Sequence, residues 1–160
     1  MNIQYWFPKS TDEKFKLMKF VYDNTDSFIL NTFGYVWESR GWWDRFPIQV
    51  YMVGDVLAGM HAFTVDTKAP DTIKTYYIVT GKAFRGQGIG KKLTMDILGE
   101  YSNANKKYFV NSEENSDGVG FYKKLFDNRY KVVINEFDTV DFIFEEGVTE
   151  IYNRLKNEKV

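Results

Sequence analysis

The chain contains no cysteine, and this absence excludes both a disulfide framework and a cysteine nucleophile. It has a single histidine, His61, which we read as structural, and a lone histidine is a poor metal site. Neither charge sign prevails, because 21 basic residues face 22 acidic ones and the formal net charge is −1. That balance gives no electrostatic attraction to nucleic acid or to an anionic membrane. We therefore expect no metal, no nucleic-acid partner and no membrane partner.

Long apolar runs and targeting signals are missing as well. No apolar stretch approaches the roughly 20 residues that a membrane span needs. The N-terminal residues lack the pattern of a signal peptide, and no repeat, low-complexity tract or Pro/Gly/Ser-rich linker divides the chain. With 160 residues, the chain fits one domain, residues 1–160, and a cytoplasmic location is expected. Aromatic residues make up 18%, so the interior should be rich in rings.

A glycine-rich hexapeptide is the most informative feature that is present. Residues 85–90 read Arg-Gly-Gln-Gly-Ile-Gly and follow a β-type run at 75–80. A strand, a Gly-rich turn and a helix start together present backbone N–H groups at the positive end of a helix dipole, which favours phosphate. Arg85 can add a charge-assisted contact to that phosphate. On the helix side, apolar residues recur every four positions: Ile89, Leu93, Ile97 and Tyr101.

Spacing excludes two familiar phosphate loops. A Walker A loop needs Gly, four residues and then Gly-Lys-Ser/Thr, but Gly90-Lys91 is followed by Lys92. A dinucleotide fingerprint has the form G-x-G-x-x-G, and when it is counted from Gly86 or Gly88 its last position is not a glycine in this sequence. What remains is R-x-x-G-x-G, formed by Arg85, Gly88 and Gly90. An ordinary αβ turn is the alternative reading of this hexapeptide.

A second motif follows the strand expected at 107–111. Residues 115–125 read Asn-Ser-Asp-Gly-Val-Gly-Phe-Tyr-Lys-Lys-Leu. The two motifs together resemble those of the GNAT (N-acetyltransferase) superfamily, whose acetyl-CoA pyrophosphate loop is R-x-x-G-x-G and whose later motif is N-x-x-A-x-x-[LF]-Y-x-K-L-G-F. Gly118 replaces the small Ala, and the Gly-Phe after the helix is absent, so Asn128 is expected to take the left-handed helix-end conformation. The matching positions are Asn115, Phe121, Tyr122, Lys124 and Leu125.

The resemblance implies an α/β fold, the GNAT (acyl-CoA N-acyltransferase) fold: a central mixed β-sheet with splayed parallel strands flanked by helices. The expected element order is β-α-α-β-β-β-α-β-α-β-β. Strands are expected at 2–7, 48–53, 56–65, 75–80, 107–111, 130–134 and 140–144, and helices after a capping box at Ser10–Glu13, at 26–39, from 89 to about 101, around Tyr122 and at 149–156.

The resemblance also assigns a cofactor site. The backbone of Ile78, Val79 and Thr80 would hydrogen-bond the pantetheine arm of acetyl-CoA. Asn115 would contact the pantetheine or position the helix, and a turn or N-cap role is the alternative. Lys92 either reaches the phosphates or is solvated. The pyrophosphate would lie on Arg85, Gly86, Gln87, Gly88, Ile89, Gly90 and Lys91.

Tyr122 is the expected general acid, because the family tyrosine protonates the leaving thiolate. A structural tyrosine packed beside Phe121 is the alternative. The general base is open, since no carboxylate lies within 75–80, where some family members carry a glutamate. Glu113, with Glu114, is the candidate base, directly or through water. Both are equally readable as exposed loop charges, and the amine can also arrive deprotonated through a water chain.

The expected function is that of an acetyl-CoA-dependent N-acetyltransferase. The acetyl group would pass to a primary amine by direct attack in a ternary complex, because no cysteine can carry it. The acceptor is a small-molecule or protein amine, and Trp42 and Trp43 either line its pocket or cover the core. The alternative is a non-catalytic acyl-CoA-binding module. A homodimer is possible, since GNAT-like domains often dimerise.

Overall fold

The computed structural model describes residues 2–7, 11–25, 47–66, 72–102, 106–113, 117–127, 129–134 and 139–157, without the side chains of 11, 66, 111–113, 117–119 and 139. Within these residues, seven strands form one sheet in the order β1-β2-β3-β4-β5-β7-β6. The elements are β1 (Ile3–Trp6), α1 (Thr11–Asn24), β2 (Ile48–Val53), β3 (Val56–Asp66), β4 (Thr72–Thr80), the 3-10 turn η1 (Lys82–Phe84), α4 (Ile89–Glu100), β5 (Lys107–Glu113), α5 (Asp117–Phe126), β6 (Lys131–Ile134), β7 (Thr139–Gly147) and α6 (Val148–Asn157).

The chain divides into two compact units, one formed by residues 1–62 and 78–93 and the other by 63–77 and 94–160. The single domain expected for 1–160 stays a prediction. The mixed α/β fold class is confirmed, as is the order of the elements in the described ranges. The helix expected at 26–39 and Ser10 of the capping box lie outside the described residues. No helix in the described part of the chain is both long and apolar enough to cross a membrane.

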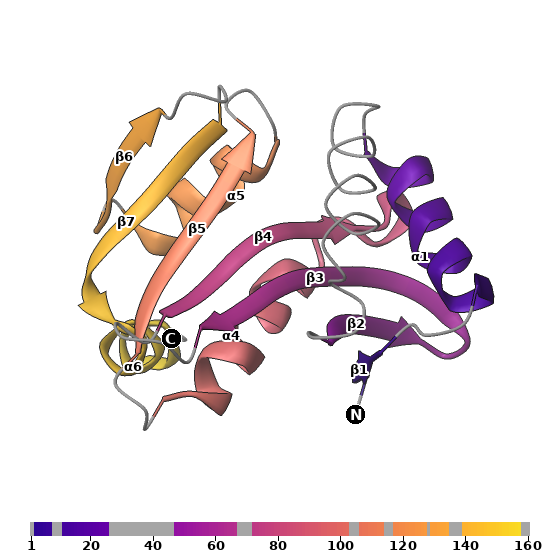
Figure 1. Cartoon of the computed structure of the whole chain (residues 1–160), viewed down its shortest axis with the longest axis horizontal. Helices are drawn as coiled ribbons and strands as arrows, with labels where there is room; N and C mark the ends of the chain where they lie inside the picture. The colour runs from indigo at the N-terminus through magenta and orange to yellow at the C-terminus, as the bar shows by residue number, and fades with distance from the viewer. Residues whose placement is uncertain are drawn as a thin grey trace. The chain divides into compact units, whose positions relative to one another are not determined.

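In the first unit, β1 and β2 run antiparallel and lie side by side (Figure 1). A turn at Gly54 and Asp55 joins β2 to β3, and Gly54 has a φ of 60°, which explains its glycine. The helix α1 buries Leu17 and Val21 while Tyr22 stays exposed, so one stripe of an amphipathic helix packs inward. This unit contains the glycine-rich loop and the end of β4 that leads into it.

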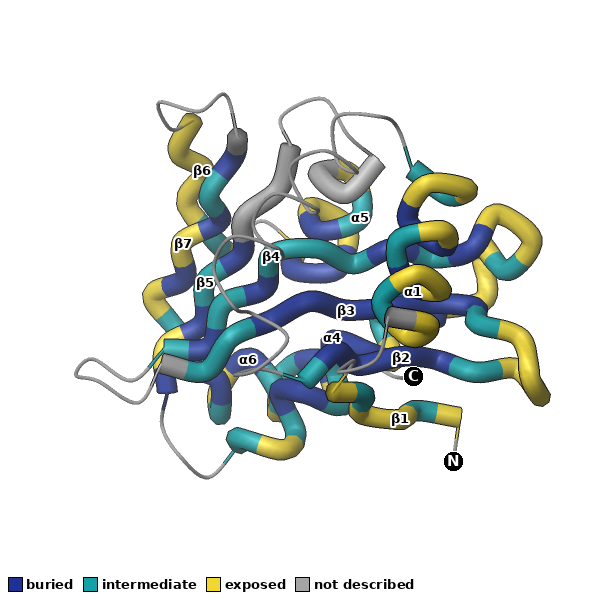
Figure 2. Tube along the Cα trace, turned by 45° about the vertical axis from the view of Figure 1, so that its right-hand side comes forward, coloured by how far each residue is buried: buried dark blue, intermediate teal, exposed yellow. Residues whose placement is uncertain are grey.

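In the second unit, β5, β7 and β6 form consecutive antiparallel strands (Figure 1). One face of this sheet carries a core of aromatic rings from β5, α5 and β7, which confirms that the interior is rich in rings. β6 is the last strand of the sheet, and all of its residues are exposed (Figure 2). The rings of the core are Tyr108, Tyr122, Phe126, Phe142 and Phe144.

The parallel pairing of β4 with β5 is short. It begins at Thr72 opposite Lys107 and ends at Thr75 opposite Val110. Both strands continue beyond this ladder, β4 to Thr80 and β5 to Glu113. The residues of β4 after Thr75 therefore lie outside the β4–β5 hydrogen-bond ladder in the described structure, as expected for parallel strands that splay.

Candidate active site

The glycine-rich loop takes a backbone conformation that only glycine adopts easily. Gly86 has a φ of 80° and Gly88 a φ of 76°, both in the left-handed region. A Cβ built at either position meets nothing within 4 Å, so open space lies in front of both glycines. The glycines are therefore required by backbone conformation rather than by crowding, and the backbone there is open to a ligand.

The loop leads directly into α4. The amide of Lys92 donates to the carbonyl of Gly88 at 2.9 Å, which makes Gly88 the N-cap of the helix. The amides of Ile89, Gly90 and Lys91 belong to the first turn of α4 and precede this first hydrogen bond of the helix. The positive end of the α4 dipole lies at this point, so the loop has the polarity that suits an anion.

The start of α4 is packed closely against the first unit's sheet. Ile89 and Leu93 are buried in one cluster with Tyr51 and Ala58. A Cβ at Gly59 would come within 2.7 Å of the Ile89 side chain, so β3 needs glycine there to let the helix approach. Lys92 lies with its Nζ 5.6 Å from the centroid of the Tyr51 ring. Lys92 therefore makes a cation–π contact with Tyr51. The neighbouring Lys91 is half-buried.

The last residues of β4 adjoin the same cluster. Ile78 packs against it, Val79 is buried and Thr80 is half-buried. The amide of Gly81 then donates to the carbonyl of Ala58 at 2.8 Å, which fixes the end of β4 to β3. The three residues expected to bind the pantetheine arm thus lie on one continuous segment with the loop.

The side chain of Arg85 is hydrogen-bonded to the end of α1. One of its guanidinium nitrogens, Nη2, donates to the main-chain carbonyl of Asn24 at 3.1 Å. Asn24 also accepts a hydrogen bond from the amide of Lys82 on its Oδ1 at 2.8 Å. Sequence reasoning missed Asn24, because it lies 58 positions before Lys82 and no local pattern links the two residues.

Tyr122 lies inside the ring core of the second unit. Its side chain is 3% exposed, and its ring lies parallel to that of Phe126, with the centroids 6.2 Å apart. The rings of Phe121 and Phe142 lie 5.0 and 5.5 Å away. Burial, and next the nearby Tyr108 phenol, raise the pKa of Tyr122 well above its ordinary value of 10.0. The phenol is therefore protonated at any physiological pH.

Tyr108, on β5, is a second buried phenol that sequence reasoning missed. Its hydroxyl shares a 2.8 Å hydrogen bond with the hydroxyl of Thr75 on β4. Its ring stacks on Phe144 at 5.4 Å, and burial raises its pKa. The two phenols therefore differ, because Tyr108 has a hydroxyl partner while no described residue hydrogen-bonds the hydroxyl of Tyr122. An aromatic residue in a predicted strand gave no signal of this pairing.

Several expected site residues are not placed. Asn115, Glu114 and the Trp42–Trp43 pair lie outside the described residues. Glu113 is the last residue of β5, where its backbone pairs with Thr139, and its side chain is not described. The candidate base is thus placed by its backbone alone.

His61 is completely buried on β3, with its Nδ1 2.8 Å from the Oε1 of Gln49 on β2. Desolvation lowers its pKa from 6.5 to about 3, so the ring is neutral at physiological pH. Such a group is a weak base, and its burial fits the structural role expected from the sequence.

Comparison of the fold with solved structures gives relatives that are distant in sequence. A protein described as a GNAT-family acetyltransferase from Desulfovibrio desulfuricans has a TM-score of 0.68 at 9% identity, covering 91% of this chain and 98% of its own. The PaiA N-acetyltransferase from Thermoplasma acidophilum, in complex with coenzyme A, has a TM-score of 0.65 at 13% identity, covering 90% and 99%. Naa50 from Arabidopsis thaliana, in complex with the bisubstrate analogue CoA-Ac-MVNAL, has a TM-score of 0.58 at 15% identity, covering 89% and 97%. At these identities, the likeness shows the fold.

Comparison with curated protein sequences finds no match. The sequence profile of the Acetyltransferase (GNAT) family matches residues 17–127, a span that includes the loop, β5 and Tyr122. The resemblance read from the two motifs is therefore confirmed over more than half of the chain. The protein belongs to the GNAT family of acetyltransferases.

Proposed function

We propose that this protein is an acetyl-CoA-dependent N-acetyltransferase that acetylates a primary amine by direct attack in a ternary complex. The observation that carries the proposal is the loop at 85–90, where two left-handed glycines with open space before them lead into the N-terminus of α4. Membership of an acetyltransferase family supports the same activity. No cysteine is present to carry the acetyl group, so a single direct transfer is the simplest route.

The described residues fit the cofactor. Gly86 and Gly88 leave the loop backbone open to a pyrophosphate, and the first amides of α4, at Ile89, Gly90 and Lys91, belong to the positive end of the helix. We assign the pyrophosphate to residues 85–91 and the pantetheine arm to the backbone of 78–80, beyond the last β4–β5 pair. The coenzyme A in the PaiA structure and the CoA-containing analogue in the Naa50 structure support acetyl-CoA as the cofactor.

Tyr122 is the residue to which we assign proton transfer. Bound acetyl-CoA supplies an acetyl thioester whose sulfur must leave as the amide bond forms. The phenol of Tyr122 carries its proton at physiological pH, as an ordinary phenol does, and the burial that raises its pKa makes it a weaker acid. We assign to its Oη a hydrogen bond or a proton to that sulfur as the thiolate leaves. General acid help of this kind contributes about 10²–10⁴-fold in rate.

The attacking amine must lose a proton, and we assign this step to Glu113 at the end of β5, directly or through water. The alternative is an amine that reaches the site already deprotonated through a water chain. His61 is set aside, because a pKa of about 3 makes it a weak base. The acceptor we propose is a primary amine of a small molecule or a protein, and Asn115 contributes to the pantetheine site or to positioning α5.

One observation favours the alternative of a non-catalytic acyl-CoA-binding module. Tyr122 lies in a core of rings, which is also where a purely structural tyrosine would lie. A binding module would keep the loop and show ligand binding without turnover. The two readings therefore agree on the loop and differ on Tyr122.

The test is the melting temperature with and without acetyl-CoA, with free CoA beside it, for the wild type and Gly88→Glu. A ligand of the native state raises stability by RT ln(1 + [L]/Kd), so the wild type should show a shift that Gly88→Glu loses through backbone strain and charge. A screen of amines for released CoA then tests turnover. Absence of a shift at millimolar acetyl-CoA would overturn the proposal, and a shift without turnover of any amine would favour the binding module.

The cytoplasmic location and the homodimer also stay proposals. Cell fractionation with an antibody against the chain tests the first, and sedimentation at micromolar concentration tests the second.

A further inference from the structure

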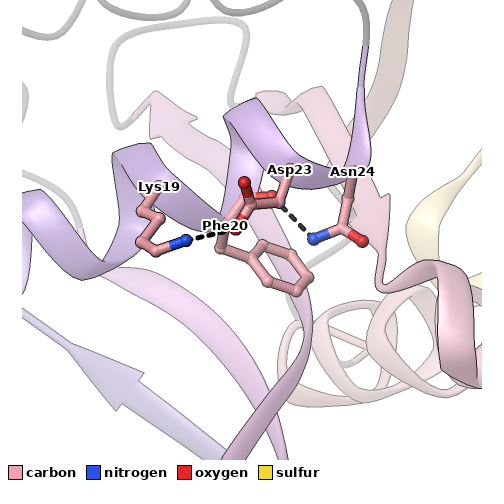
Figure 3. Close-up of polar contacts among 4 residues, drawn as sticks. All are labelled: Lys19, Phe20, Asp23 and Asn24. Carbon is pink, nitrogen blue, oxygen red and sulfur yellow. Dashed lines mark hydrogen bonds and ion pairs between the residues drawn. The ribbon is translucent and has the colours of Figure 1, made fainter.

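Asn24, the last residue of α1, makes three hydrogen bonds with three different groups. Its Nδ2 donates to the carbonyl of Phe20 at 2.7 Å, which caps the end of its own helix (Figure 3). Its Oδ1 accepts from the amide of Lys82 at 2.8 Å. Its main-chain carbonyl accepts from the guanidinium of Arg85 at 3.1 Å. One half-buried side chain thus joins the end of α1 to the segment that precedes the glycine-rich loop.

The bond to Lys82 meets a specific need of that segment. Lys82 begins the 3-10 turn η1, and the residue at the N-cap is Gly81, which has no side chain to accept the first amide of the turn. Gly81 cannot readily be replaced, because a Cβ there would lie 3.3 Å from the carbonyl oxygen of Ala58 and 3.5 Å from the Phe20 ring. The cap that Gly81 cannot provide comes instead from Asn24.

The bond from Arg85 has an electrostatic reason. The carbonyls at the end of α1 carry the negative end of its dipole, and the last turn of α1 contains no basic residue. Arg85 supplies the missing cation from the other segment. The residues on either side of η1, Gly81 and Arg85, are therefore both held: Gly81 by Ala58 of β3 and Arg85 by Asn24 of α1.

We infer that Asn24 is a positioning residue for cofactor binding. It fixes η1 and Arg85, the first residue of the loop at 85–90, and so pre-orders the backbone that receives the pyrophosphate. Without the Asn24 side chain, the amide of Lys82 loses its partner and the turn must be ordered when the ligand binds, which weakens binding. The inference rests on the proposed pyrophosphate site, and it adds that the end of α1 and the loop are ordered together.

The experiment measures the Kd for acetyl-CoA by calorimetry in the wild type, Asn24→Ala and Asn24→Asp. Asn24→Ala removes both side-chain bonds, and we expect Kd and KM for acetyl-CoA to rise about five- to tenfold, the effect of one hydrogen bond, with kcat unchanged. Asn24→Asp keeps an oxygen for the Lys82 amide but loses the bond to Phe20 and places a negative charge at the end of α1. It should therefore melt at a lower temperature yet bind acetyl-CoA as the wild type does.

The matched control is Asp23→Ala, one residue earlier, which removes an exposed 2.7 Å ion pair with Lys19 and no bond to the loop (Figure 3). It should leave the Kd unchanged. Hydrogen exchange at the Lys82 amide of the ligand-free protein should be faster in Asn24→Ala and not in Asp23→Ala. An unchanged Kd in Asn24→Ala, or equal weakening in Asn24→Ala and Asn24→Asp, would overturn the inference. A wild type that binds no acetyl-CoA would overturn the proposed function itself, so the two failures are distinguishable.

Discussion

The glycine-rich loop at 85–90 and the ring core around Tyr122 are built in opposite ways. The loop is shaped by backbone: a Cβ at either of its two left-handed glycines would meet nothing within 4 Å, and residues 85–88 are exposed. The ring core is shaped by side chains, with Tyr122 enclosed by Phe121, Phe126 and Phe142. At Gly86 and Gly88, a change of residue alters the backbone conformation and leaves side-chain packing untouched. In the core, almost any change alters packing before it alters chemistry.

This difference decides how function can be separated from structure. A loop glycine has no packing role, so its effect on binding can be measured against another left-handed glycine elsewhere in the chain. Tyr122 serves both packing and, in our proposal, proton transfer, so a test must keep the ring and remove the hydroxyl alone. The ring core offers a second phenol, Tyr108, as the reference for that test.

The largest expected effect is that of Tyr122→Phe. The ring and its contacts remain, and no described residue hydrogen-bonds the lost hydroxyl, so the melting temperature should change little. If Tyr122 donates the proton, kcat should fall about 10²–10⁴-fold, while the Kd for acetyl-CoA stays the same. Steady-state kinetics with the best amine from the screen, beside calorimetry, measures both quantities.

Tyr108→Phe is the matched control for this prediction. It removes a hydroxyl of the same kind from the same core, but leaves the buried Thr75 hydroxyl without its 2.8 Å partner. It should lower the free energy of unfolding by about 1–3 kcal/mol and leave kcat nearly unchanged. Equal losses of kcat in the two variants would contradict proton donation by Tyr122 and would indicate that both phenols act only in the packing of the core.

The next prediction concerns pH, because burial lowers the pKa of His61 and raises the pKa values of the two phenols. His61, in the unit that contains the loop, has its pKa lowered from 6.5 to about 3, so its stabilising effect is complete above pH 6.5 and is lost as pH falls toward 3. The phenols of Tyr108 and Tyr122 have raised pKa values, so their contribution to the free energy of unfolding is complete below pH 10 and is lost as the pH rises above it.

Acid should therefore weaken the protein through His61, and alkali through the ring core. Below pH 6.5, each pH unit should reduce the free energy of unfolding by up to about 1.4 kcal/mol through His61 alone. Urea unfolding of the wild type and His61→Gln between pH 5 and 7.5 isolates this slope, which the variant should lack. Identical slopes in both proteins would show that His61 does not titrate on unfolding as its burial requires.

The smallest effect compares two glycines of the first unit. Gly54 and Gly88 have φ values of 60° and 76°, and a Cβ at either meets nothing within 4 Å. Gly54→Ala and Gly88→Ala should therefore cost about the same stability, roughly 1–2 kcal/mol. Only Gly88→Ala should also weaken acetyl-CoA binding, by about fivefold, if around 1 kcal/mol of the strain opposes the bound conformation. Equal Kd values for the two variants would separate the loop from the cofactor.

The sequence predicted what depends on neighbours along the chain. The glycine-rich turn before α4, the start of α4 at Ile89 and the hairpin at Gly54 follow from local backbone preferences, and the structure confirms them. Strand positions were right, and β2 has the expected bounds of 48–53, but other strand ends differ: β4 starts at Thr72 rather than 75, and β7 runs to Gly147 rather than 144. Hydrogen bonds to neighbouring strands extend a strand beyond the run of residues whose alternating pattern predicts it.

The sequence could not predict what depends on contacts between distant segments. Asn24 meets Lys82 across 58 positions, and Thr75 meets Tyr108 across 33, so no local pattern identifies either pair. The left-handed residue after α5 is Asp127, with a φ of 46°, whereas the expectation named Asn128, which lies outside the described residues. Both side chains tolerate that conformation, and composition alone does not choose between them.

The exposed last strand has a consequence for how concentrated solutions of the protein behave. β6 reads Lys-Val-Val-Ile, and its aliphatic residues Val132, Val133 and Ile134 are 45%, 45% and 58% exposed. Its described partner is β7, which leaves the outer backbone groups of the strand facing away from the sheet. Such an edge, rich in β-branched residues, is a template for unwanted strand pairing, and a lysine is what natural sheets use to oppose it. Among the four residues of β6, Lys131 alone carries a charge, and its Nζ lies 4.0 Å from Oε1 of Glu145 on β7, so the resistance of this strand to unwanted pairing depends on one lysine.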